Sequence, residues 1–299
     1  MYNQITANKR KTWLLVGLIA AVIIGLSYAF ALLRGVDPAG AIVIGTMIST
    51  VYALIGYYGS AGIALATSGA KLVTKQQAPE LWNLVENLCI ANGQSMPKLY
   101  VIDDASPNAF ATGRDPEHAA IAFTTGLLAT LDKNELQGVA AHELSHVKNY
   151  DIRVMTIVVV LVGAVMLIAD ILLRGGHLFG GRDNRGGGQA TIVLFVLGLV
   201  LAILSPLFAQ LIQLAVSRSR EYLADASGAL LTRYPEGLAG ALQKISSVET
   251  PLRRANHATA HLFIASPFGG GRKRGFWREI FSTHPPVEDR VARLLHMGH

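Results

Sequence analysis

The chain has 299 residues, of which 51% are hydrophobic and only 15% are charged. Soluble domains average about 25% charged residues, so this composition argues against a simple soluble globule, and the many apolar residues exclude a disordered chain. We expect the net charge of +6 to orient the chain in a membrane rather than to bind nucleic acid. Because Cys89 is the single cysteine, any metal site must use histidine and carboxylate ligands.

Two long apolar segments predict a transmembrane hairpin over residues 1–70. Residues 12–33 carry no charge, and a helix of this length, rising about 1.5 Å per residue, can cross the hydrocarbon core. A second span is expected over about 39–66, after a tight turn at 34–37. Both ends of the hairpin then lie on the side of the basic residues 9–11, which the positive-inside rule places in the cytoplasm.

A cleaved signal peptide is the alternative interpretation of the first apolar segment. Residues 9–11 form a basic start, and residues 29–31 read Ala-Phe-Ala, which resembles a cleavage site. The apolar stretch is longer than the roughly 7–15 residues of an ordinary signal peptide, which favours a permanent span.

Residues 154–217 hold two further hydrophobic segments, 154–173 and 190–216, which we expect to span the membrane or to form a re-entrant hairpin. The loop between them carries three arginines against one aspartate, and this opposes the charge rule for a loop on the outer side. In either case the chain returns to the cytoplasmic side. Residues 71–153 and 218–299 are therefore expected to fold together as the two parts of one catalytic domain.

A helix is predicted from about Lys133 to Tyr150. Asp132 can cap its first turn, and Glu135 stands at the third helical position, as in a capping box. The apolar residues that follow keep a helical period, so the helix has a buried face.

This helix carries the sequence His-Glu-Leu-Ser-His at residues 142–146. Because residues four apart lie on one helix face, His142 and His146 can reach one metal ion, while Glu143 projects beside them toward a water molecule. The alternative is a pair of surface histidines on an amphipathic helix.

A zinc site of this kind needs a third protein ligand. Glu221 follows the fourth hydrophobic segment directly, and Asp225 lies four residues later on the same predicted helix face. Glu221 would complete a His-His-Glu site, and Asp225 could bond the outer nitrogen of a ligand histidine. Alternatively, the two acids pair with Arg218 and Arg220 on a solvated face.

A second histidine pair, His257 and His261, has the same spacing, but Ala258 follows the first histidine. This pair therefore lacks a carboxylate that could act as a base. We expect a packing or surface role for both histidines.

The chain resembles the HtpX-type membrane zinc endopeptidases, relatives of the CAAX prenyl peptidases, over nearly its whole length. The resemblance lies in HELSH, SREYLAD, ATAHLFIASPF and THPPVEDR, together with the N-terminal hairpin. It implies a mainly α membrane protein with transmembrane helices and a cytoplasmic α+β zincin-like metalloprotease domain. It implies one Zn²⁺ per subunit with Glu221 as the third ligand and Asp225 behind a ligand histidine. It also implies that His284 and Arg290 lie near the metal.

The same resemblance implies a multi-pass protein of the cell inner membrane that takes part in protein quality control and the stress response. Its partners would be the lipid bilayer and protein substrates, above all misfolded or damaged membrane proteins, and not nucleic acid. Glu143 would act as general base, and His284, helped by Arg290 or Tyr222, would stabilise the oxyanion. The oligomeric state is not indicated.

Two strands are predicted at residues 99–103 and 119–124, with a turn at 108–110 after the first strand. Zinc peptidases of this kind hold an extended substrate against the edge of such a strand. Asn108, Ala109 and residues 119–124 are therefore candidate substrate contacts, although the strands could also serve only as a scaffold for the helix.

Two other classes of protein fit parts of the sequence. A transporter would explain the apolar helices and Asp170 within one of them, but not the HELSH motif together with Glu221. A membrane-anchored zinc protein with a binding role would need the ligands but would not need Glu143.

Overall fold

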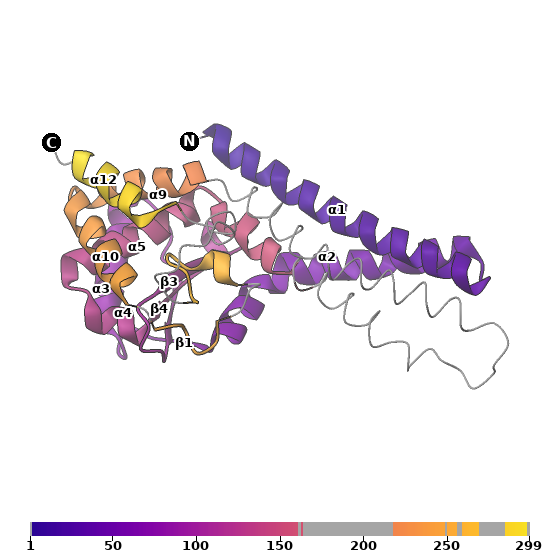
Figure 1. The fold of residues 1–299 in the computed structure, drawn as a ribbon, viewed down its shortest axis with the longest axis horizontal. Coiled ribbons are helices and arrows are strands. Elements are labelled where there is room, and N and C mark those ends of the chain that lie inside the picture. The colour runs from indigo at the N-terminus through magenta and orange to yellow at the C-terminus, as the bar shows by residue number, and fades with distance from the viewer. Residues whose placement is uncertain are drawn as a thin grey trace.

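The computed structural model describes residues 2–160, 163, 218–248, 250–255, 259–268 and 285–297. These residues form a mostly helical molecule with one four-stranded sheet. Two long helices, α1 and α2, lie side by side and extend away from the compact part that holds the sheet (Figure 1). The predicted segment 190–216 lies outside the described residues. Of the segment 154–173, only residues 154–160 and 163 are described, and they are helical.

The hairpin consists of α1 (Tyr2–Arg34) and α2 (Pro38–Ser68). Asp37 caps α2 by accepting hydrogen bonds from the backbone of Ala39 and Gly40, so the turn between the helices is as short as the sequence predicts. Helix α1 begins well before the uncharged segment, because basic residues are good helix formers and continue the helix beyond the apolar stretch.

Both hairpin helices are long and apolar enough to cross a membrane, and only 17% of each apolar window is buried inside the protein. The outward faces carry large exposed hydrophobic side chains, among them Trp13, Leu14, Val43, Met47 and Tyr58. Soluble monomers rarely expose large contiguous apolar patches, which mark interaction or membrane surfaces. The helices therefore have the surface of membrane spans.

The helical residues 151–160 connect the hairpin to the compact part. Ile157 and Val158 pack against Ile19 and Ile23 of α1, and the Tyr52 hydroxyl of α2 donates a hydrogen bond to the carbonyl oxygen of Val160 at 2.7 Å. The hairpin is thus packed directly onto the helix that follows the histidine motif.

The sheet has the order β1-β2-β4-β3, formed by β1 (Ala70–Leu72), β2 (Lys98–Ile102), β4 (Ala119–Thr124) and β3 (Ala109–Gly113). Strand β4 is parallel to β2 and antiparallel to β3. The predicted strand 119–124 is therefore internal, and neighbours on both sides occupy its backbone groups. The expectation that it offers an edge to a substrate is wrong, because the outer strand on this side is β3.

The remaining helices belong to the compact part, in which α5 contacts α9, α10, α3 and strand β3. Their bounds are α3 (Pro79–Asn92), α4 (Thr125–Thr130), α5 (Lys133–Lys148), α9 (Arg218–Thr232), α10 (Pro235–Ser247) and α12 (Val287–Met297). Two short 3₁₀ turns span Pro116–His118 and Ala260–Leu262. One core joins the apolar face of α5 to the sheet and to α10, with Val139, Leu144, Ile121, Phe123, Leu238 and Leu242 fully buried.

Candidate metal centre

Helix α5 begins with the predicted capping box. The Asp132 carboxylate accepts hydrogen bonds from the backbone of Asn134 and Glu135, and the Glu135 carboxylate accepts one from the backbone of Asp132 at 2.9 Å. The helix ends at Lys148, two residues earlier than predicted, because Tyr150 adopts a left-handed backbone conformation with φ of 59°. A tyrosine rarely adopts this conformation, so the sequence contains no signal for it.

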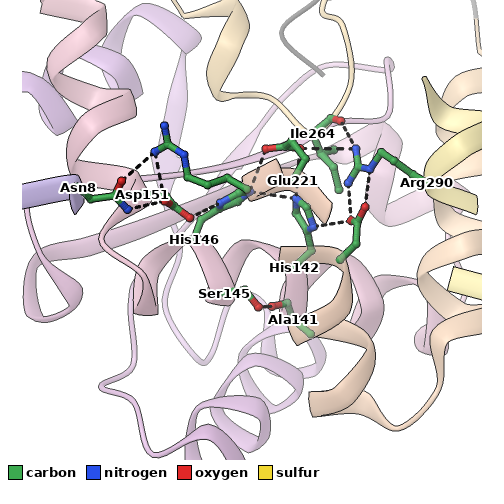
Figure 2. A network of polar contacts seen from close by, with 11 residues as sticks. Asn8, Ala141, His142, Ser145, His146, Asp151, Glu221, Ile264 and Arg290 are labelled. Carbon is green, nitrogen blue, oxygen red and sulfur yellow. Dashed lines mark hydrogen bonds and ion pairs between the residues drawn. The ribbon is translucent and has the colours of Figure 1, made fainter. Parts of the chain in front are cut away.

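Three ligand groups meet where α5 packs against α9 (Figure 2). His142 Nε2 lies 3.1 Å from His146 Nε2, and the Glu221 carboxylate lies 3.5 Å from His146 Nε2 and 3.9 Å from His142 Nε2. All three side chains are buried, and their ligand atoms fall within 4.8 Å of one another. The structure therefore brings together the three residues that the sequence singles out as ligands.

The outer nitrogens of both histidines face carboxylates. His142 Nδ1 lies 2.9 Å from Asp225, and His146 Nδ1 lies 3.2 Å from Asp151. Carboxylates at these positions orient the rings, so the Nε2 atoms of both rings point toward one place beside the Glu221 carboxylate. Two imidazole nitrogens and a carboxylate that converge in this way favour a cation between them.

The spacing of the three groups suits a small tetrahedral ion. Ligands about 2.0–2.1 Å from a tetrahedral zinc lie about 3.3 Å from one another, close to the separations of 3.1, 3.5 and 3.9 Å given above. Burial lowers the pKa of His142 and so favours its neutral ring. In His146 the Asp151, Glu221 and Glu143 carboxylates outweigh burial and raise the pKa to about 9, so a positive charge is favoured within the cluster. The residues present therefore fit a divalent metal with nitrogen and oxygen ligands.

Glu143 is buried beside the cluster and contacts the outer strand of the sheet. Its carboxylate accepts a hydrogen bond from the backbone N–H of Ala111 in β3. Burial and the nearby Glu221 carboxylate raise the pKa of Glu143 to about 7. A carboxyl group with such a pKa can take up and release a proton near neutral pH.

Asp225 is held by a buried arginine from α12. Arg290 donates two hydrogen bonds to its carboxylate, at 2.8 and 2.7 Å, and a third to the carbonyl oxygen of Ile264. Burial alone would raise the pKa of Asp225, but Arg290 and His142 outweigh this effect and lower it to about 2. Asp225 therefore stays ionised and contacts His142 as expected. Arg290 also lies 3.7 Å from Glu221.

Asp151 is the site residue that the sequence reasoning missed. It lies five positions beyond His146, outside the helical spacing that places side chains on one face, and it reaches His146 only because Tyr150 turns the chain. In the sequence, Asp151 is marked as a candidate partner of His146 merely by following it closely.

The other residues considered in the sequence analysis do not belong to the three-ligand cluster as described. His284 and His257 lie outside the described residues. His261 is buried and donates from Nε2 to the Met155 carbonyl oxygen at 2.8 Å, so its ring serves packing as predicted. Cys89 is buried, and burial raises the pKa of its thiol to about 11. The Tyr222 ring lies against the guanidinium of Arg293, 3.9 Å from ring centroid to cation.

The predicted substrate contacts on β3 are already used within the protein. Asn108 is buried and bonds the backbone of Ala265 through both ends of its amide, and the Ile264 N–H donates to the Ala109 carbonyl at 2.9 Å. Phe110 pairs with Phe263 as an isolated bridge. In this structure residues 263–265 therefore occupy the first half of the β3 edge.

Comparison with known proteins identifies the family of the chain. Residues 75–298 match the model of peptidase family M48. A protease HtpX homolog from Tropheryma whipplei is 47% identical over 100% of this chain and 99% of its own length, and one from Dictyoglomus thermophilum is 46% identical over 99% and 95%. The crystal structure of S. mikatae Ste24p has a similar fold, with a TM-score of 0.51 and 17% identity, over 98% of this chain and 67% of its own. The chain therefore belongs to peptidase family M48 and is a membrane metalloprotease, as its resemblance to the HtpX-type enzymes predicts.

Proposed function

We propose that this metalloprotease is a zinc-dependent endopeptidase with one Zn²⁺ per subunit, held by His142, His146 and Glu221. The observation that carries the proposal is the convergence of these three buried groups from α5 and α9, with their ligand atoms within 4.8 Å. Nitrogen and oxygen ligands with one open position are typical of catalytic zinc. A role limited to binding would give no reason for Glu143 beside the ligands.

Glu143 acts as the general base of the reaction. Bound zinc would lower the pKa of water and polarise the scissile carbonyl. Glu143 takes a proton from the attacking water and returns it to the leaving amine, which its pKa of about 7 allows. The Ala111 N–H and the surrounding core hold the carboxylate beside the three ligands.

Asp225 and Arg290 act through the ligands and not on the substrate. Asp225 holds His142, and the Arg290 guanidinium is committed to Asp225 and the Ile264 carbonyl. Arg290 is therefore a poor donor for an oxyanion, in contrast to the sequence-based expectation. We assign oxyanion stabilisation to His284, as the resemblance to the HtpX-type enzymes implies.

We further infer that the enzyme is a multi-pass protein of the inner membrane and that it cuts misfolded or damaged membrane proteins at the cytoplasmic face. The basic residues 9–11 precede the first span, and the positive-inside rule favours a cytoplasmic location for them. The ligands flank residues 154–217: the histidines stand before this hydrophobic segment and Glu221 after it. The two catalytic parts, 71–153 and 218–299, would thus meet at the membrane surface, where such substrates are within reach.

Replacing Glu143 with glutamine tests the catalytic role. The variant keeps the three ligands but lacks the base, so cleavage of casein and of an unfolded membrane protein should fall at least about 100-fold, while zinc content measured on the purified protein stays at one per chain. Glu221→Ala should lose both zinc and cleavage. Wild-type cleavage by the Glu143 variant would exclude the mechanism, and full zinc occupancy in the Glu221 variant would exclude the third ligand.

A further inference from the structure

His146 is oriented by a carboxylate that the rest of the catalytic chemistry does not use. Asp151 Oδ2 lies 3.2 Å from His146 Nδ1, on the ring edge opposite the Nε2 atom that faces Glu221. Asp151 is buried. The position of this carboxylate therefore decides in which direction His146 presents its lone pair.

The other oxygen of Asp151 is held from the N-terminal membrane helix. Asn8 of α1 donates from Nδ2 to Asp151 Oδ1 at 2.7 Å and to the Asn149 carbonyl at 2.9 Å. Arg220, the residue before Glu221, lies 3.3 Å from both Asp151 Oδ1 and Asn8 Oδ1. Figure 2 shows Asn8, Asp151 and His146 in one row that leads from α1 to the cluster.

The same end of α1 also contacts the turn that brings Asp151 to the site. Tyr150 has a φ of 59°, and a bulky residue keeps this strained conformation only where its surroundings enforce it. The Lys9 ammonium lies over the Tyr150 ring at 4.7 Å, and the Arg153 guanidinium at 5.2 Å. Helix α1 thus contacts both the strained turn and the carboxylate that follows it.

We propose that Asn8 is a positioning residue of the metal centre, which acts through Asp151 on His146 and makes the first turns of membrane helix α1 part of the support of the site. This inference rests on the proposed metal ligands. Outer partners of ligand histidines contribute about 10–100-fold to metal affinity. Asn8 is one step further from the metal, so its contribution should be smaller than that of Asp151 and should depend on Asp151.

The simpler explanation is that Asn8 only anchors α1 to the compact part. Both roles predict that an alanine variant is less stable, so a stability measurement alone does not separate them. If Asn8 positions the metal centre, its replacement with alanine also changes the metal affinity, and this change disappears in a protein that lacks Asp151. Anchoring predicts that the two substitutions act independently.

The test is a double-mutant cycle on the full chain in detergent, with Asn8→Ala, Asp151→Ala and the double variant. Zinc affinity is measured by competition with a chromophoric chelator, the visible spectrum is recorded after substitution with Co²⁺, and the thermal midpoint is measured on metal-free protein. Thr12→Val is the matched control. Thr12 is fully buried one turn further along α1, and its hydroxyl bonds the carbonyl of Asn8 and not Asp151.

Asp151→Ala is expected to weaken zinc binding 10–100-fold and Asn8→Ala roughly 3–10-fold, with an altered Co²⁺ spectrum in both. The double variant should bind zinc no more weakly than Asp151→Ala, and Thr12→Val should bind as the wild type does. Unchanged affinity and spectrum in Asn8→Ala, or losses that multiply in the double variant, would overturn the inference. A wild-type protein that binds no zinc would instead contradict the proposed function.

Discussion

Arg290 is a buried cation in the core between α9 and α12, with its side chain only 1% exposed. Its charge is matched by Asp225, which it contacts through two hydrogen bonds, and by the Glu221 carboxylate at 3.7 Å. Bringing such charges out of water is costly, and only complete pairing offsets the cost. Removing one member of this group would therefore leave buried charge without its partner.

Replacing Arg290 with alanine should lower the free energy of unfolding by about 3–5 kcal/mol, because the buried Asp225 carboxylate loses its arginine partner. The loss should appear as a lower denaturant midpoint in detergent. The double variant Asp225→Asn/Arg290→Gln removes both charges and should recover part of the stability. A single Arg290 variant as stable as the wild type would show that water or another group reaches Asp225.

The dependence of stability on acidic pH gives a second measurement of the Asp225–Arg290 pair. The pKa of Asp225 is about 2 in the folded protein and about 4 in an unfolded chain. The contribution of the pair is therefore complete above about pH 4 and is lost as the pH falls toward 2. The Arg290 variant should lack this component of the acid unfolding.

The residues of the metal centre differ in how far the sequence could predict them. His142, Glu143 and His146 follow from spacing on one predicted helix, and Glu221 was found as a carboxylate on a second one. Asp151 could not be found in this way, because its approach to His146 requires the left-handed turn at Tyr150. Non-local partners such as Asn8, 143 positions away from Asp151, leave no pattern in the sequence.

Helix α5 packs so closely against α9 and against α10 that a glycine lies at each contact. A Cβ atom at Gly228 of α9 would lie 3.0 Å from the backbone nitrogen of His142, and one at Gly138 of α5 would lie 2.7 Å from the backbone nitrogen of Leu238 in α10. Backbone atoms cannot move aside as side chains do. The glycines therefore set the distance between the helix that carries the histidines and its neighbours.

Gly228→Ala should push α9 away from α5 and with it Glu221. Overpacking costs typically 1–3 kcal/mol, and the higher helix propensity of alanine returns about 1 kcal/mol, so we expect a net loss of about 1 kcal/mol and weaker zinc binding. Thermal midpoints and chelator competition measure the two effects. Gly62→Ala in α2 is the control, because a Cβ atom at this position would meet nothing within 4 Å. Equal behaviour of the two variants would contradict the close-packing argument.

The sequence predicted α5 with its cap and the strands β2 and β4, since these depend on local patterns. It did not predict which strand lies at the edge of the sheet. Strand pairing joins residues that are far apart in the chain. In addition, all residues of β3 are buried, so β3 has no alternation of polar and apolar side chains that would mark an edge strand. Residues 263–265 cover part of that edge, so an extended peptide along β3 would have to replace them there.

At the scale of the whole molecule, the hairpin and the compact part are joined through α1, α2 and the helical residues 151–160. The turn between the hairpin helices lies at the far end of the molecule from the sheet in Figure 1. If the compact part is cytoplasmic, this turn must lie on the opposite side of the membrane.

Single cysteines can test this orientation in a Cys89→Ser background. Val36 in the turn is 56% exposed, and Gln76 near the sheet is also exposed. A membrane-impermeant maleimide applied to spheroplasts should label Val36→Cys, and it should label Gln76→Cys only in inverted vesicles. The reverse pattern would place the catalytic part outside, and labelling of both from one side would exclude the hairpin as a pair of spans.

His146 and Glu221 stand 75 positions apart in the chain, and the residues between them include both later hydrophobic segments. A metal ion held by these two residues acts as a cross-link that closes this loop. Closing a loop of this length removes roughly 4 kcal/mol of conformational entropy from the unfolded chain. The ion would therefore also tie together the two ends of this long stretch of chain, so that loss of the metal would lower the stability of the fold as well as stop hydrolysis.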